Sequence, residues 1–195
     1  METRDRSINA NMNKEIINSI IRNRKSIYPK DYSKEDIPDK TIKEILLNAN
    51  HAPTHRMTQP WFFKVYKNKS KQKLIDVVSK IDESKLSKIK LNKFIEKVND
   101  SNTVISVFIK RDKNERLPEW EEIAAVSMSV QNMWLTCYVN NIGSYWSTPG
   151  FIDEYGKLIN LDFNESSLGF FFMGVYKHGE STKTRDDIDS KVDWV

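Results

Sequence analysis

Residues 51–61 read His-Ala-Pro-Thr-His-Arg-Met-Thr-Gln-Pro-Trp and connect a predicted helix to a predicted strand. The helix covers residues 39–50 and has one apolar face at helical spacing, formed by Ile42, Ile45, Leu46 and Ala49. The strand follows at once, as Trp-Phe-Phe-Lys-Val-Tyr over residues 61–66. The chain is therefore predicted to fold around a short helix-to-strand loop with a buried element on each side.

The loop itself combines stiffness with many hydrogen-bonding groups. We expect Pro53 to end the helix and Pro60 to hold Gln59 in an extended conformation. Such a loop suits a site for a flat ligand with polar edges, although a polar, proline-rich turn without a ligand would have the same composition.

The overall composition restricts the class of protein. With 195 residues, 38% of them hydrophobic and 30% charged, the chain is predicted to form one globular, soluble domain. The net charge of +4 is mild and fits a weakly anionic small ligand as well as nucleic acid, but no basic run alternates with aromatic residues at a regular spacing. We therefore favour a small-molecule partner over nucleic acid. The single cysteine, Cys137, excludes an internal disulfide and favours a cytoplasmic location, and the three histidines lack metal-site spacing. Residues 1–13 hold no apolar signal segment.

A basic cluster ends the first predicted helix, residues 13–24, whose apolar stripe is Ile16, Ile17, Ile20 and Ile21. Arg22-Asn23-Arg24-Lys25-Ser26 has two interpretations. Cations in a last helical turn are favoured by the helix dipole. Two guanidinium groups, an ammonium and a hydroxyl in five residues would also form a phosphate clamp.

The middle of the chain carries fewer motifs. Residues 28–38 form a polar connection, and Asp36 or Asp39 is predicted to cap the next helix. Residues 70–81 and 85–98 are predicted helices. The lysines of the second helix are interpreted as a solvated face, and a mobile lid is the alternative for this segment.

The second half contains the most apolar elements. Residues 103–109 are β-branched and predict a strand, and Pro118 is predicted to begin a helix with an acidic first turn. Residues 123–139 are apolar nearly all round, but polar residues interrupt them. This pattern favours a helix buried at the domain centre or at a subunit interface over a transmembrane span. Cys137 is then a packed core thiol.

A short strand from residue 144, a helix over residues 151–160 and a strand over residues 168–175 complete the core. The last strand is apolar throughout, as expected of a strand buried on both faces. The polar tail, residues 177–195, is either disordered or an arm that docks through Trp194.

Taken together, the order of these motifs resembles the nitroreductase family of FMN-dependent oxidoreductases. The resemblance spans residues 16–185 and is carried by the basic cluster, the Ala-Pro-x-His-x-x-x-Gln-Pro-Trp loop, and the Gly-Ser-Tyr-Trp and Leu-Gly-Phe-Phe-Phe-Met-Gly segments. It implies an α+β fold with a central, mostly antiparallel sheet flanked by helices, in an intertwined homodimer. The chain would then divide into a polar extension (1–12), the FMN-binding domain (13–176) and a C-terminal arm (177–195).

The resemblance also implies two FMN sites at the dimer interface. By position, Arg24, Lys25 and Ser26 would hold the phosphate and ribityl chain, and Arg185 would reach the phosphate. The partner subunit would supply His51 and His55. The flavin would be lined by Trp146, Ser147 and Thr148. Lys25 stands where the family commonly has a second arginine, Tyr28 where it has a basic residue, and Met57 where many members have asparagine.

The implied activity is a ping-pong cycle in which NAD(P)H gives a hydride to the flavin and a small, electron-poor acceptor such as a nitroaromatic or quinone receives it. The cofactor supplies the chemistry, so no catalytic side chain, metal or membrane partner is predicted. Two alternatives stay open from the sequence. One is a flavin-binding protein without turnover, for storage or regulation. The other is a basic nucleic-acid-binding module.

Overall fold

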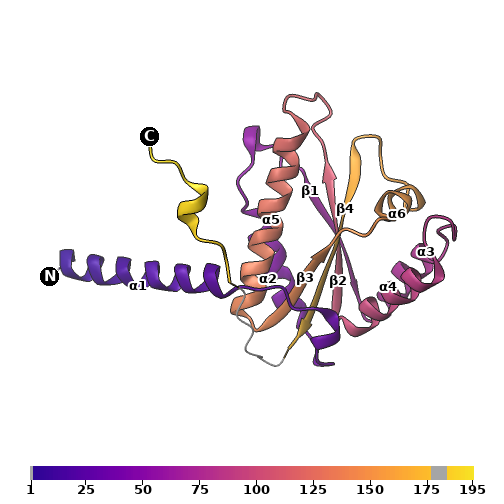
Figure 1. Cartoon of the computed structure of the whole chain (residues 1–195), viewed down its shortest axis with the longest axis horizontal. Helices are drawn as coiled ribbons and strands as arrows, with labels where there is room; N and C mark the ends of the chain where they lie inside the picture. The colour runs from indigo at the N-terminus through magenta and orange to yellow at the C-terminus, as the bar shows by residue number, and fades with distance from the viewer. Residues whose placement is uncertain (1, 177–183) are drawn as a thin grey trace.

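The computed structural model describes residues 2–176 and 184–195, with side chains from residue 11 onward, and Figure 1 shows its arrangement. Part of the predicted arm, residues 177–183, lies outside the described residues. The elements follow in the order α1 (Glu2–Asn23), η1 (Pro29–Asp31), α2 (Asp39–Asn50), η2 (His55–Met57), β1 (Trp61–Lys67), α3 (Ser70–Val78), α4 (Lys88–Asp100), β2 (Thr103–Lys110), α5 (Glu119–Val139), β3 (Ile142–Ser147), α6 (Ile152–Leu158), β4 (Glu165–Val175) and η3 (Ile188–Lys191).

The four strands form one sheet in the order β1-β2-β4-β3, and every neighbouring pair is antiparallel. The central strands β2 and β4 are buried along most of their length, and for β4 this confirms the burial that its unbroken apolar run predicted. Helices cover both faces of the sheet (Figure 1). The predicted α+β class with an antiparallel sheet flanked by helices is confirmed.

One face of the sheet packs against α2 and α5. The side chains of Val126, Val130 and Met133 on α5 are fully buried there, which confirms a helix at the centre of the domain. Cys137 is also buried, and burial raises the pKa of its thiol to about 12, as expected of an inert core cysteine. No helix in the described part of the chain is long and apolar enough to cross a membrane.

The opposite face packs against α3, α4 and α6 in a second hydrophobic cluster. The segment that could have been a lid contributes to this core, because Leu86, Phe94 and Val98 are all buried. Pro118 lies just before α5 rather than inside it, and the acidic first turn begins at Glu119. Helix α4 also forms one side of a cavity.

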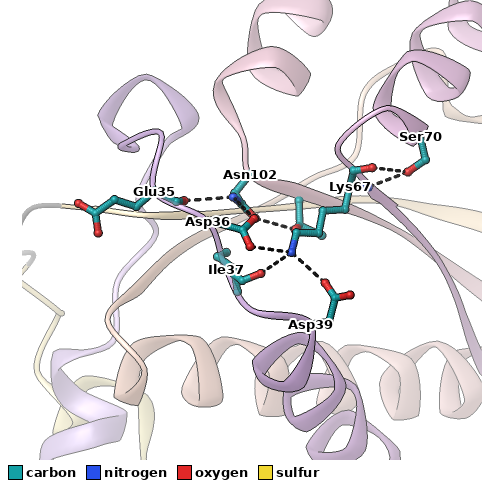
Figure 2. A network of polar contacts seen from close by, with 8 residues as sticks. Glu35, Asp36, Ile37, Asp39, Lys67, Ser70 and Asn102 are labelled. Atoms are coloured by element: carbon teal, nitrogen blue, oxygen red, sulfur yellow. Dashed lines mark hydrogen bonds and ion pairs between the residues drawn. The ribbon is translucent and has the colours of Figure 1, made fainter.

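The predicted carboxylate cap of α2 is wrong. Pro38 occupies the N-cap position without a side-chain bond, and both aspartates instead bind Lys67 at the end of β1 (Figure 2). The Lys67 ammonium donates to Asp36 at 3.1 Å, to Asp39 at 2.8 Å and to the carbonyl of Ile37 at 2.6 Å. The hydrogen bond from Lys67 lowers the pKa of Asp36. This ammonium therefore ties the start of α2 to the sheet.

Replacing Lys67 by methionine should destabilise the fold by about 1–2 kcal/mol, because three acceptors lose a charged donor. Lys73→Met is the matched control, since Lys73 is exposed on the neighbouring α3. Urea unfolding of the two variants measures the difference. Equal midpoints would contradict the role assigned to Lys67.

The first helix is longer than predicted and already begins at Glu2, inside the segment expected to be a polar extension. It projects away from the body of the molecule (Figure 1). Its apolar stripe, Met12, Ile16, Ile17 and Ile21, is about half exposed. At the other terminus, Trp194 is 89% exposed in the single chain. Near both termini, apolar groups are thus left uncovered by the described residues.

Candidate functional site

Arg24 follows directly after α1. The backbone N–H of Ile27 donates to the carbonyl of Ser144 at 3.0 Å, so the chain joins the outer strand β3 just after the basic cluster. The guanidinium carbon of Arg24 lies 4.7 Å from the centre of the Trp134 ring on α5. Its Nε is buried and has no hydrogen-bond partner among the described residues. A buried charged donor left without a partner is costly and indicates a place for an acceptor.

A second guanidinium group reinforces this indication. The pKa of Arg24 is lowered, first by burial and then by the positive charge of Arg185. The positive charge of Arg185 thus acts unfavourably on Arg24, and no carboxylate in the described part of the chain forms an ion pair with Arg24. An anion between them would relieve the repulsion. Arg24 therefore has a cationic neighbour and no ion-paired carboxylate among the described residues, which suits an anionic ligand.

Trp146, Ser147 and Thr148 lie at the end of β3, over a glycine of β4. The indole Nε1 of Trp146 is buried without a partner among the described residues, while the Thr148 hydroxyl donates to the carbonyl of Leu168 at 2.9 Å. Gly169 has φ of 124°, and a Cβ there would come within 3.0 Å of both Trp146 Nε1 and Thr148 Oγ1. Only glycine leaves this space open. The indole donor suits a ligand that is rich in hydrogen-bond acceptors.

A cavity of about 270 Å³ begins at Ser147 and continues beneath α4. Its floor is aromatic, from Phe94, Phe151, Phe170 and Phe172, and α4 supplies Lys90, Lys93 and Lys97. A second cavity of about 430 Å³, which shares Lys93 and Lys97, reaches Tyr28. The interpretation of these lysines as a solvated face is therefore incomplete. Their spacing of three and four residues along one helix was the only signal in the sequence for this role.

The loop over residues 51–61 does not have the predicted backbone. Gln59 has φ of 45° and is left-handed rather than extended. The preference that Pro60 imposes is overridden because the Gln59 N–H donates to Thr54 Oγ1 at 3.1 Å, which closes the loop. Arg56 and Met57 are left-handed as well, at φ of 51° and 53°. Consecutive strained residues of this kind are frequent at functional sites.

His55 is held at the start of α5, far from Arg24 in the same chain. Its Nδ1 lies 2.7 Å from Glu121 Oε2, and its side chain is 59% exposed. Arg24 contacts Trp134, thirteen positions further along α5, which is about 20 Å at the rise of an α-helix. His51 is exposed at the end of α2. Within one chain, the charge of Arg185 therefore acts on Arg24, and Ser147 lies beside a cavity, but His55 is kept away from Arg24.

Comparison with known proteins agrees with this geometry. A model described as "Nitroreductase family" matches residues 21–175. The Bacillus subtilis protein that carries the name NAD(P)H nitroreductase YfhC is 28% identical over 179 residues, covering 89% of this chain and 91% of its own length. A nitroreductase-like family protein from Bacillus cereus has the same fold, with a TM-score of 0.81 at 22% identity, over 92% of this chain and 95% of that chain. A structure from Desulfovibrio desulfuricans, described as a nitroreductase in complex with FMN, aligns with a TM-score of 0.69 at 22% identity over 89% of this chain and 93% of that chain.

Proposed function

The chain belongs to the nitroreductase family, and on this premise we propose that it is an FMN-dependent oxidoreductase that passes hydride from NAD(P)H to a small electron-poor acceptor. The observation that carries the proposal is a pair of buried donors, Arg24 Nε and Trp146 Nε1, that have no hydrogen-bond partner among the described residues. Both are groups that an acceptor-rich cofactor would satisfy. The name of the Bacillus subtilis relative and the FMN in the Desulfovibrio desulfuricans structure support the same cofactor pair.

In this proposal the residues have distinct tasks. Arg24 and Arg185 hold the phosphate, with Lys25 and Ser26 beside the ribityl chain. Trp146, Ser147 and Thr148 line the ring. The half-buried Lys97, whose ammonium lies 5.4 Å from the Tyr145 ring centre, supplies positive charge where this chain has Tyr28 in place of a basic residue. A fixed cation in a partly dry site favours negative charge on the ring.

FMN, when bound, would accept two electrons as hydride and pass them on, so one pocket can serve donor and acceptor in turn. The protein needs no nucleophile for this cycle. Its part is to hold the cofactor, to stack aromatic substrates on the exposed ring and to limit the access of water. The buried Phe170 and Phe172 contribute an apolar wall.

We also propose that the site is shared between two chains of a homodimer. The separation of His55 from Arg24 in one chain supports this, because the loop over residues 51–61 would then reach the site of the partner. The half-exposed apolar stripe of α1 supports it as well, since an apolar face on a projecting helix marks an interface.

Turnover separates this proposal from a flavin-binding protein without activity. Under anaerobic conditions, NADH or NADPH should bleach the visible absorption of the purified protein, and an added quinone should restore it. Repeated cycles with excess substrates should consume one NAD(P)H per quinone. A yellow protein that neither nucleotide bleaches would contradict the proposed activity and favour the storage or regulatory alternative.

A further inference from the structure

The cavity beneath α4 carries positive charge on its rim without any acidic residue among those that line it. Lys90, Lys93 and Lys97 follow one another at three- and four-residue spacing and so share one face of the helix. Lys90 and Lys97 are about 10 Å apart along the helix axis. The cavity therefore combines an aromatic floor with a row of ammonium groups.

Two of these ammonium groups form no ion pair within the described part of the chain. Lys90 and Lys93 are exposed and form no ion pair with any carboxylate in the described residues, whereas Lys88 on the same helix lies 3.7 Å from Glu83. Lys97 differs from both, because it is half-buried over Tyr145 beside the residues proposed to line the flavin. Lys90 and Lys93 are thus free to meet a charge on a second ligand.

The aromatic floor of the cavity indicates the chemistry of the uncharged part of that ligand. Phe94 makes ring contacts with Phe151, Phe170 and Phe172 at centroid distances of 5.3, 5.0 and 6.3 Å. A wall of packed aromatic rings favours a flat aromatic molecule. A negatively charged substituent on that molecule would gain from the two lysines, and a positively charged one would be repelled.

We propose that the electron acceptor is an aromatic anion, such as a ring that bears a carboxylate, and that Lys90 and Lys93 hold its charge at the rim of this cavity. This inference rests on the proposed function. It adds the substrate class to it, because a neutral nitroaromatic or quinone would gain nothing from the two lysines.

Two acceptors of matched shape test the charge directly, 4-nitrobenzoate and 4-nitrobenzamide. The amide withdraws electrons from the ring more strongly than the carboxylate does, so chemical reactivity alone favours the amide. The protein with bound FMN is reduced anaerobically with dithionite, and its reoxidation by each acceptor is followed by stopped flow. NAD(P)H, itself an anion, is thereby kept out of the measurement.

We expect the second-order rate constant for 4-nitrobenzoate to exceed that for the amide about tenfold at low salt, and the preference to shrink as salt is added. In Lys90→Met/Lys93→Met the preference should disappear. Calorimetric binding of 4-nitrobenzoate to the oxidised protein should weaken about tenfold in the same variant, with an unchanged FMN content. Lys88→Met, on the same helix, is the control and should keep the preference. Each single variant should lose part of it, which gives a second reading if the double variant folds poorly.

Equal rates for the two acceptors in the wild type, or the same loss in Lys88→Met, would overturn the inference. The proposed function would survive that result as long as NAD(P)H reduces the bound flavin and either acceptor reoxidises it. A protein that NAD(P)H cannot reduce would instead overturn both the proposed function and the inference built on it.

Discussion

Replacing Arg24 by alanine is expected to weaken FMN binding about ten- to hundredfold, because a charged hydrogen bond contributes about 1.5–3 kcal/mol. We expect the Arg24 guanidinium to contribute more to phosphate binding than the Lys25 ammonium does, for two reasons. It is stacked on Trp134 with a buried Nε that lacks a partner among the described residues. A guanidinium can also grip a phosphate through two parallel bonds, whereas an ammonium acts as a point charge. Lys25→Ala should therefore cost less.

Titration of the apo-protein with FMN, followed by flavin fluorescence, measures these affinities. Arg22→Ala is a suitable control, since Arg22 is an exposed arginine in the last turn of α1 that carries the same charge. Arg24→Lys should recover part of the lost affinity but not all of it. Equal affinities for the wild type and Arg24→Ala would contradict the placement of the phosphate between Arg24 and Arg185.

The parts of the fold that the sequence predicted are those set by local pattern. The β-branched residues of β2, the apolar run of β4 and the nearly continuous apolar surface of α5 could be recognised without knowledge of their partners. The cap of α2 could not, because Lys67 competes for Asp36 and Asp39 from 31 and 28 positions away along the chain. An oppositely charged side chain that is distant in sequence can thus bind the carboxylates that would otherwise cap a helix. The sequence around the helix start does not reveal this competition.

The residues of the candidate site were likewise predictable from the sequence only in part. Arg24 and Trp146–Thr148 were expected from the family resemblance, and the structure adds that Arg24 Nε and Trp146 Nε1 are buried without a partner among the described residues, which supports the proposed role. The prediction of an extended Gln59 was wrong because the hydrogen bond that its N–H donates to Thr54 Oγ1 overrides the preference of residues before proline. The cavity at α4 was missed because its floor, Phe170 and Phe172, comes from β4, far along the chain from Lys90 and Lys93. Helical spacing alone cannot distinguish a solvated row of lysines from the rim of a cavity.

The second large effect on FMN binding is expected in a mixed dimer, because it can restore an intact site that neither homodimeric variant retains. In a dimer with Arg24→Ala in one chain and His55→Ala in the other, a shared arrangement leaves one site with both residues intact. The other site lacks both. The reciprocal dimer, with both substitutions in one chain and a wild-type partner, leaves each shared site with one residue missing. If each site lay within a single chain, the reciprocal dimer would instead keep one intact site.

The central claim, that each FMN is held by Arg24 of one chain and His55 of the other, is tested most directly by FMN titration of these two mixed dimers, purified with a different affinity tag on each chain. The shared arrangement predicts one FMN per dimer at wild-type affinity when the substitutions are on different chains, and none when they are on the same chain. The opposite pattern, or a monomer that binds a full equivalent of FMN, would contradict the claim.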